Sequence, residues 1–274
     1  MPCILGISGK KQSGKNTTAN YIHGKVLKSM GMISNFYVDK AGELAIETTN
    51  QVGETGYGVF DVTRKDEEFT SYAERDLWPY IKMYSFADGL KSLCVEFFGL
   101  KPEQVYGTDE QKNQIQEHLL WENMPRFVNS NIIKKPPIDS RIGSIQGWEP
   151  VKAYWKEGPM TAREFMQYLG TDVMRKMYEP VHVNHALDKI LSEQSNLAIV
   201  PDVRFPNEVK AIQDAGGKVV RLTRNTRKDN HASECGLDPE NFDWDNFDAI
   251  IHNDGSLEDT LQKVDEVCSP IIGQ

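Results

Sequence analysis

Several features are scarce in this sequence of 274 residues, and each shortage narrows the class of protein. Basic residues do not predominate, because 31 Lys and Arg stand against 40 Asp and Glu, for a formal net charge of −9. A surface that binds the nucleic-acid backbone normally needs a basic face, so we expect no nucleic-acid partner. A single nucleotide needs only a local cluster of Lys and Arg, which this composition allows.

Cysteine is also scarce, with four residues scattered through the chain at positions 3, 94, 235 and 268. They lack the close spacing of zinc ligands and follow no secretory signal, so we expect reduced thiols. No apolar run approaches the length needed to cross a bilayer, and the first predicted strand begins close to the N-terminus. We therefore expect a cytoplasmic protein without a membrane partner.

What the sequence does contain is a phosphate-binding loop at residues 9–16, Gly-Lys-Lys-Gln-Ser-Gly-Lys-Asn. The apolar run from Ile4 to Ile7 predicts a buried strand before it, and the segment from Lys15 to about Met30 predicts a helix after it. In this setting the glycines let backbone N–H groups face phosphate oxygens, while Lys15 and the helix N-terminus add positive charge. The pattern indicates a nucleotide enzyme, and a chance glycine-rich turn is the alternative.

One position in the loop departs from the usual pattern. Asn16 stands where a serine or threonine usually follows the lysine, and Thr17 comes next. An amide oxygen is a poorer Mg²⁺ ligand than a hydroxyl, so we expect Thr17 or a water molecule to make that contact.

Strands and helices alternate along the rest of the chain, which predicts an α/β fold with a doubly wound parallel sheet of the P-loop NTPase type. We expect a single domain over residues 1–274, with insertions at about 33–75 and 102–160 and a lid at about 224–247. The first insertion has the alternation of a hairpin, and we expect both to lie outside the core of the sheet. The other expected strands are 81–86, 197–200, 218–222 and 248–252, and the other expected helices are 88–98, 161–173, 183–193, 206–215 and one from 257 onward.

Two further strands end in polar residues, at the sheet edge where ligands bind in open α/β folds. One ends in Ser85-Phe86-Ala87-Asp88, with Lys91 one helical turn on, and the other ends in Asp202-Val203-Arg204, with Asn207 and Glu208 soon after. An aspartate there can hold Mg²⁺ or its waters, and an arginine can bind a phosphate with two hydrogen bonds. The alternative is an aspartate that caps the next helix and an arginine paired with it.

Thr161-Ala162-Arg163-Glu164 has the form of a capping box, which predicts a helix start. Arg163 and Gln167 share a face of that helix and suit a phosphate and the edge of a base, although spacing alone favours an ordinary solvated face. Between the last two strands, four cations fall within eight residues and precede His231-Ala232-Ser233-Glu234. They predict either a lid over the transferring phosphate or a solubilising loop, and they are Arg221, Arg224, Arg227 and Lys228.

Taken together, these segments resemble the deoxynucleoside monophosphate kinases of tailed bacteriophages. The resemblance rests on motifs that keep the family's order along the chain: residues 8–19, 85–91, 106–109 with Lys112, 161–172, 201–208, 231–234 and 253–257. Such enzymes transfer the γ-phosphoryl group of ATP to a deoxynucleoside 5′-monophosphate, with Mg²⁺ as cofactor. The resemblance would place a phage-encoded chain in the host cytoplasm.

The resemblance implies a role for each matching residue. Catalysis would fall to Lys15, Arg204, Asp202 and Arg224, and the metal to Thr17 and Asp202. The ATP site would comprise Gly9, Lys10, Lys11, Ser13, Gly14, Lys15, Asn16, Thr17, Arg227 and Asn253, the last of them beside the adenine. The deoxynucleotide site would comprise Asp88, Lys91, Arg163, Gln167, Asp172, Arg175, Arg204 and Glu208.

Other functions stay open at this point. A kinase of another small acceptor, such as dephospho-coenzyme A, has the same type of phosphate loop, and a non-catalytic nucleotide-binding module is a further alternative. A switch-type GTPase is disfavoured, because the sequence has no Asn-Lys-x-Asp segment to recognise guanine. The sequence leaves open which bases are accepted and whether the chain forms a homodimer.

Overall fold

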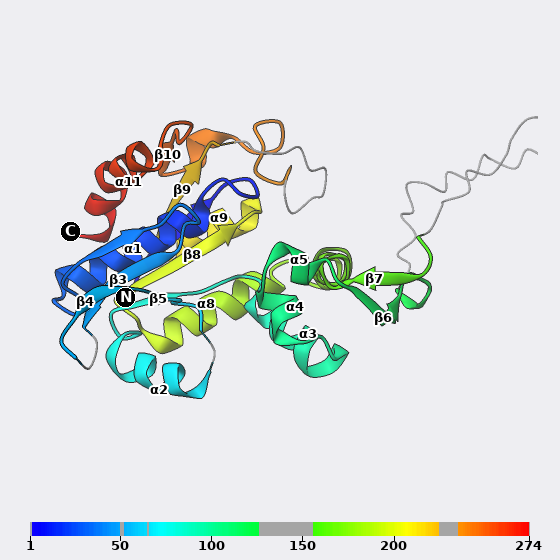
Figure 1. Cartoon of the computed structure of the whole chain (residues 1–274). Helices are drawn as coiled ribbons and strands as arrows, with labels where there is room; N and C mark the ends of the chain where they lie inside the picture. The colour runs from blue at the N-terminus through cyan, green and yellow to red at the C-terminus, as the bar shows by residue number, and fades with distance from the viewer. Residues whose placement is uncertain (1, 50–51, 65, 126–155, 225–234, 274) are drawn as a thin grey trace, which may run out of the picture. The chain divides into compact units, whose positions relative to one another are not determined.

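The computed structural model describes residues 2–49, 52–64, 66–125, 156–224 and 235–273 (Figure 1). The chain divides into two compact units. The first unit comprises Met1–Gly89 and Glu179–Gln274, and the second comprises Leu90–Tyr178. We predicted a single domain, and the second unit takes in most of the segment that we predicted as the 102–160 insertion.

The first unit is built on a five-stranded sheet in the order β10-β9-β1-β8-β5, in which every neighbouring pair is parallel. Its strands are β1 (Cys3–Ser8), β5 (Ile81–Met83), β8 (Leu197–Val203), β9 (Lys218–Leu222) and β10 (Ala249–Ile251). Both apolar runs that we predicted as buried strands, at β1 and β8, form the middle of the sheet. The predicted doubly wound parallel sheet is therefore confirmed.

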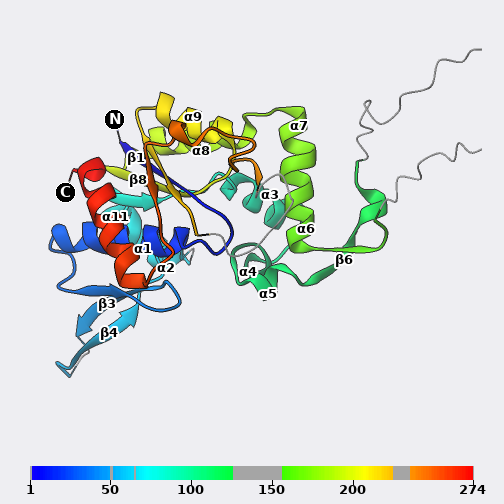
Figure 2. The same cartoon turned by 90° about the horizontal axis from the view of Figure 1, so that it is seen from above.

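Helices cover both faces of this sheet (Figure 2). On one side lie α1 (Lys15–Ser29) and α11 (Leu257–Ile272), and on the other lie α8 (Val181–Glu193) and α9 (Pro206–Asp214). Successive side chains of a strand point to opposite faces. Accordingly Leu5 packs in one core cluster with Ala19 and Val264, whereas Ile4 packs in the other with Val183 and Val209.

The first insertion contains the predicted hairpin but also contributes to the core. Strands β2 (Phe36–Val38), β3 (Leu44–Thr49) and β4 (Thr55–Val59) form an antiparallel sheet, and helix α2 (Glu67–Asp76) follows. Phe69 and Ala73 of α2 are buried in the same cluster as Leu5, so the expectation that this whole segment lies outside the core is wrong. The side chain of Asp66 accepts a hydrogen bond from Phe69 N and caps the helix that buries these two residues.

The second unit has a small core of its own, formed in part by Val105, Leu119, Met160 and Phe165. Its helices are α3 (Asp88–Phe98, which begins in the first unit), α4 (Pro102–Tyr106), α5 (Asp109–Lys112) and the short 3₁₀ turn Trp121–Asn123. Strands β6 (Ile115–Leu120) and β7 (Pro159–Thr161) pair antiparallel. After them a helix runs as α6 (Ala162–Gln167), the π-helical segment Tyr168–Met174 and α7 (Arg175–Met177).

Candidate active site

The predicted phosphate loop follows β1 at the carboxyl edge of the sheet, level with the ends of the neighbouring strands β8 and β9. Ser8, the last residue of β1, is in register with Val203 of β8 and with Arg221 of β9. Ligands in open α/β sheets bind beyond this edge. The candidate site of the first unit therefore consists of the loop after β1, Arg204 after β8 and Arg224 after β9.

The phosphate loop ends at Gly14, which has a φ of 97° and forms the N-cap of α1. A left-handed conformation of this kind is easily adopted only by glycine. Lys15 follows as the first helical residue and is 9% exposed. Its Nζ donates hydrogen bonds to the carbonyl oxygens of Gly9 at 2.8 Å and Lys10 at 2.7 Å. The loop thus curls around the ammonium group of its own lysine.

The residues next to Lys15 face different surroundings. Asn16 is exposed, and Ser13 is buried. Thr17 lies against the turn between β2 and β3, because a Cβ atom added to Gly42 would come within 2.3 Å of Thr17 Oγ1. Gly42 also has a φ of 86° and accepts a hydrogen bond from Asn20 Nδ2, which holds the turn against α1. The Thr17 hydroxyl is therefore directed to this turn, and its predicted metal contact stays untested.

Asp202 connects two strand ends of the first unit. One carboxylate oxygen accepts a hydrogen bond from Ser85 Oγ at 2.5 Å, and the other accepts one from Phe86 N at 3.1 Å. Ser85 Oγ in turn accepts a hydrogen bond from Ala87 N. The sequence suggested a metal ligand or a cap of the following helix. In the structure Asp202 holds the turn that leads from β5 to Asp88 at the start of α3, and its predicted metal contact stays untested. A carboxylate has about four acceptor sites, so these bonds leave some of its capacity unused.

Glu208 supports the backbone on which Arg204 stands. It is 1% exposed, and Oε2 accepts hydrogen bonds from Arg204 N at 2.7 Å and Phe205 N at 3.1 Å. These bonds satisfy backbone N–H groups at the start of α9. Glu208 is thus placed as a buried helix cap, and its predicted contact with the deoxynucleotide stays untested.

Arg224 and Asn253 form a junction beside the phosphate loop. Asn253 is 1% exposed, its Nδ2 donates to Ser13 O at 2.7 Å, and its Oδ1 accepts from Arg224 N at 2.9 Å. The guanidinium of Arg224 donates to the carbonyl oxygens of Asn253 and Gly255. The amide of Asn253 therefore ties the loop to the end of β9, and its predicted place beside adenine stays untested.

The predicted lid is described only in part. Arg227, Lys228 and the segment 231–234 lie outside the described residues. Arg221, which we had grouped with the lid cations, is a buried residue of β9. Leu237 and Phe247 are also buried, in the same cluster as Ile4. At these two positions the segment 235–247 contributes to the core of the first unit, and the expectation of a lid over residues 224–247 stays untested.

In the second unit, the helix predicted after Thr161 is present with both hydrogen bonds of its capping box. Arg163 on this helix donates to Asp109 Oδ1 at 2.6 Å and to Asn113 Oδ1 at 3.0 Å. The Gly170-Thr171-Asp172 sequence lies in the π-helical segment, a rare distortion that is frequent at functional sites. Arg163 therefore contacts residues of the 106–113 segment, which the sequence had linked to it only by resemblance.

Of the other predicted deoxynucleotide ligands, Asp88 begins α3 in the first unit, and the rest lie in the second unit. The ammonium of Lys91 stands 5.2 Å from the ring centroid of Tyr106. Gln167 ends α6, and Arg175 begins α7. Asp172 pairs with Lys176 at 3.2 Å.

Comparison with known proteins identifies the family. The family model for deoxynucleotide monophosphate kinase matches residues 108–264. A deoxynucleotide monophosphate kinase of Enterobacteria phage T4 is 33% identical over 276 residues, which cover 95% of this chain and 96% of that protein. The chain belongs to the deoxynucleotide monophosphate kinase family. The family predicted from the sequence motifs is thereby confirmed.

Two other relatives of this kinase cover less of the chain. A protein of Acanthamoeba polyphaga mimivirus, named provisionally for the same enzyme, is 25% identical over 194 residues, or 66% of this chain and 79% of that protein. The deoxynucleotide monophosphate kinase of Escherichia phage RB69 is 30% identical over 113 residues, or 38% of this chain and 43% of that protein. The family model begins at residue 108, so it does not include the phosphate loop.

Membership of a kinase family implies ATP as co-substrate and a divalent metal that accompanies its phosphates. Among the described residues, no three His, Cys, Asp or Glu side chains are grouped to hold a metal ion. Mg²⁺ does not need such a group, because it usually keeps several waters and binds through one or two carboxylates together with substrate phosphates. Within the described ranges, no helix has the length and apolar composition to cross a membrane.

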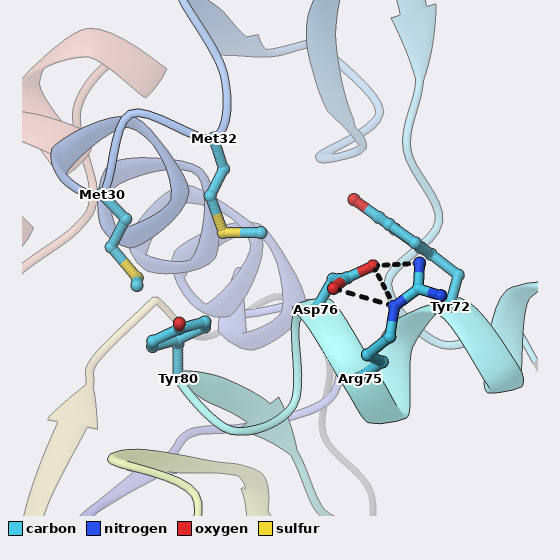
Figure 3. A pocket seen from close by; sticks show the side chains of 6 residues that line it. All are labelled: Met30, Met32, Tyr72, Arg75, Asp76 and Tyr80. Atoms are coloured by element: carbon cyan, nitrogen blue, oxygen red, sulfur yellow. Dashed lines mark hydrogen bonds and ion pairs between the residues drawn. The ribbon is translucent and has the colours of Figure 1, made fainter.

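A hollow of about 410 Å³ lies elsewhere on the first unit of this kinase, and Figure 3 shows its lining. It is lined by Met30, Met32, Tyr72, Arg75, Asp76 and Tyr80, with Arg75 turned toward Asp76 in an ion pair of 2.6 Å. Met30 follows the last residue of α1, whereas the phosphate loop precedes the first. A helix of 15 residues is about 22 Å long, so the hollow is remote from the nucleotide site.

Proposed function

We propose that this kinase transfers the γ-phosphoryl group of ATP to the 5′-phosphate of a deoxynucleoside monophosphate. An acceptor phosphate oxygen forms a bond to the γ-phosphorus, the bond from that phosphorus to the β–γ bridging oxygen breaks, and the electron pair leaves with ADP. The proposal is carried by the phosphate loop, which curls around Lys15 at the carboxyl edge of the sheet in a member of this family. The acceptor phosphate is already ionised at neutral pH, so the reaction needs no covalent intermediate.

The loop after β1 would hold the triphosphate. Lys15 donates to two loop carbonyls, and we propose that its ammonium donates to phosphate oxygens when ATP is bound. The N-terminus of α1 and Arg224 would add positive charge. When bound, Mg²⁺ would neutralise charge on the β- and γ-phosphates, held through water by Asp202 and contacted by Asn16 or Thr17.

For the acceptor phosphate, the first unit would supply Arg204, whose backbone is fixed by the buried Glu208. We propose that Glu208 acts through this hydrogen bond and does not contact the nucleotide. The family resemblance also implies Lys91 and Arg163 as phosphate ligands and residues of the α6–α7 helix near the base, and these roles stay predictions. Asp109 accepts one hydrogen bond from the Arg163 guanidinium at 2.6 Å, and Asn113 accepts another, which leaves the guanidinium other N–H donors. The predicted deoxynucleotide ligands also include Asp88, Gln167, Asp172 and Arg175.

The experiment that tests the proposal is a coupled assay of ADP release with ATP and Mg²⁺ against every deoxynucleoside and ribonucleoside monophosphate. We expect turnover of one or a few deoxynucleotides by the wild type. Lys15→Ala should lose turnover by on the order of 10²-fold or more, because it removes a charge aimed at the transferring group. Lys25→Ala is the matched control, since Lys25 lies on the same helix but pairs with Asp265.

Two results would contradict the proposal. One is turnover of dephospho-coenzyme A with no turnover of any deoxynucleotide, which would indicate another acceptor. The other is ATP binding without any acceptor-dependent ADP release, which would indicate a non-catalytic module.

A further inference from the structure

Asp238 lies in no motif that the sequence singled out, yet it pairs with the phosphate loop. Its Oδ2 accepts a hydrogen bond from Lys10 Nζ at 2.5 Å. The Lys10 side chain is 14% exposed and the Asp238 side chain 19% exposed, so the pair is largely shielded from water. Ion pairs between fully exposed side chains contribute little, but shielding of this degree strengthens the attraction and raises the cost of removing one partner.

Arg221 completes a network around Asp238. Its guanidinium donates a hydrogen bond from one terminal nitrogen to Ser8 Oγ at 2.8 Å, and the other terminal nitrogen lies 3.9 Å from Asp238 Oδ1. Arg221 is 4% exposed, and its guanidinium carbon stands 5.1 Å from the ring centroid of Trp244. Asp238 is therefore the anion that balances two cations, one of them almost completely buried.

The network closes on itself through the backbone of the loop. Ser8, Gly9 and Lys10 are consecutive, and the side chains of the first and the last are joined through Arg221 and Asp238. The carbonyl oxygens of Gly9 and Lys10 are the acceptors of Lys15 Nζ. The ion pair that holds Lys10 in place therefore also holds the two carbonyl groups that position the ammonium of Lys15.

Asp238 itself is held firmly. The neighbouring Leu237 is buried, and its carbonyl oxygen accepts a hydrogen bond from Trp244 Nε1 at 2.9 Å. Asp238 O accepts hydrogen bonds from the backbone N–H groups of Asn241 and Phe242. The carboxylate thus projects from a turn that is anchored in the core, as a positioning group requires.

We propose that Asp238, held by Arg221, is a positioning residue that braces the phosphate loop through Lys10 and so prepares Lys15 for ATP. This inference rests on the proposed function, because it takes ATP to be the ligand of the loop. Loss of the brace leaves the loop with more conformations to lose on binding, so ATP binds more weakly. The acceptor site does not include Asp238, so binding of the deoxynucleotide is unaffected.

The test is a double-mutant cycle with Asp238→Asn and Lys10→Met, read by calorimetric titration with ATP and by steady-state kinetics. We expect each single variant to weaken ATP binding by on the order of tenfold. The double variant should bind ATP no more weakly than the more impaired of the two single variants, because residues in contact act as a unit. The KM for the deoxynucleotide should stay at the wild-type value. Asp265→Asn is the matched control, since Asp265 pairs with Lys25 at 2.6 Å away from the loop, and it should bind ATP like the wild type.

Thermal unfolding of each variant separates positioning from a general loss of fold, and Asp238→Ser replaces Asp238→Asn in the cycle if Asp238→Asn does not fold. The proposal is overturned if ATP affinity stays within twofold of wild type in the folded single variants, if their effects add in the double variant, or if Asp265→Asn weakens ATP equally. Because ATP binding is read separately from turnover, a wild type that binds ATP without transferring phosphoryl would contradict the proposed function and leave this inference intact.

Discussion

At the end of β8, two residues separated by a single position serve different ends. The Asp202 carboxylate accepts hydrogen bonds from the turn after β5, whereas the backbone N–H of Arg204 donates to Glu208. The first residue therefore shapes the edge of the site, and the second is the one that we expect to meet the acceptor phosphate.

Replacement of Arg204 by alanine tests this division. A hydrogen bond to a charged group contributes about 1.5–3 kcal/mol, so Arg204→Ala should raise the KM for the deoxynucleotide by roughly 10- to 100-fold. ATP affinity, measured by titration calorimetry, should stay close to wild type. Lys210→Ala removes a cation from α9, the helix that follows Arg204. Lys210 pairs with the exposed Asp214, so this variant should change neither value. Unchanged acceptor kinetics in Arg204→Ala would refute its role.

His23 is buried in α1, the helix that follows the phosphate loop. It is 2% exposed, and its Nδ1 atom has no hydrogen-bond partner among the described residues. Burial lowers the pKa of His23 to about 3 from the usual value of 6.5. The folded protein therefore keeps this imidazole neutral at a pH where the unfolded chain takes up a proton.

The sign of the effect follows from that difference. The contribution of neutral His23 to the free energy of unfolding is fully present above pH 6.5 and is lost as the pH falls from 6.5 toward 3. For one histidine, this loss is about 1.4 kcal/mol between pH 7.5 and 5.5. His23→Met should unfold in urea with a smaller loss of stability over this interval, whereas the exposed His252→Gln should keep the full loss. An equal acid-dependent loss in His23→Met and wild type would show that His23 is not responsible.

At the scale of elements, helix α11 shows how a local sequence signal fixes a boundary. Ser256 Oγ accepts a hydrogen bond from Asp259 N at 3.1 Å, and Asp259 Oδ2 accepts one from Ser256 N at the same distance. Hydrogen bonding to Ser256 lowers the pKa of Asp259. The helix that these bonds begin buries Val264 and Cys268 against the sheet.

Ser256→Ala should lower the free energy of unfolding by about 1 kcal/mol, which is the usual cost of losing an N-cap. Ser256→Thr keeps a hydroxyl at this position and should retain most of the stability. Urea denaturation monitored by circular dichroism measures both. An alanine variant as stable as the wild type would mean that the hydroxyl contributes nothing to α11.

Elements with strong local signals could be predicted from the sequence. The strands β1 and β8, the helix after the phosphate loop and the cap at Thr161 were predicted because apolar runs, glycine positions and capping residues act over a few neighbours. The role of Asp202 was not, because Ser85 lies 117 positions away from it in sequence. Asp238 was missed for the same reason, since its partner Lys10 is 228 positions away.

The core of α2 shows a second reason for failure. Only Phe69 and Ala73 of this helix are buried, and two residues on a polar helix give a weak apolar pattern. The signal that could have found the helix is Asp66 followed by two glutamates, an N-cap with acidic residues in the first turn. The glycine-rich hairpin before this helix led us to predict that the whole segment lies outside the core.

At the scale of the whole molecule, the two units have separate cores. The buried residues that surround Phe165 all fall between positions 90 and 174, and those of the other two clusters all fall in the first unit. Phe165 is 1% exposed and makes an edge-to-face contact with Phe98 at 4.8 Å. A substitution in this core should therefore lower the stability of the second unit first.

Phe165→Ala should destabilise that unit by about 3–5 kcal/mol, the usual cost of deleting a buried phenylalanine. We expect it to abolish deoxynucleotide turnover while ATP still binds to the first unit, as titration calorimetry would show. Phe97→Ala removes an aromatic ring that is 74% exposed and should keep full activity. Simultaneous loss of ATP binding and turnover in Phe165→Ala would show that the two units do not fold independently.

The central claim is that the γ-phosphoryl group of ATP ends on a deoxynucleotide. Incubation with γ-³²P-labelled ATP, Mg²⁺ and each deoxynucleoside monophosphate, followed by chromatography of the products, follows that group directly. We expect label to appear in a deoxynucleoside diphosphate for at least one acceptor, and to form on the order of 10²-fold or more slowly with Lys15→Ala. Label found only in inorganic phosphate, or left in ATP with every acceptor, would contradict it.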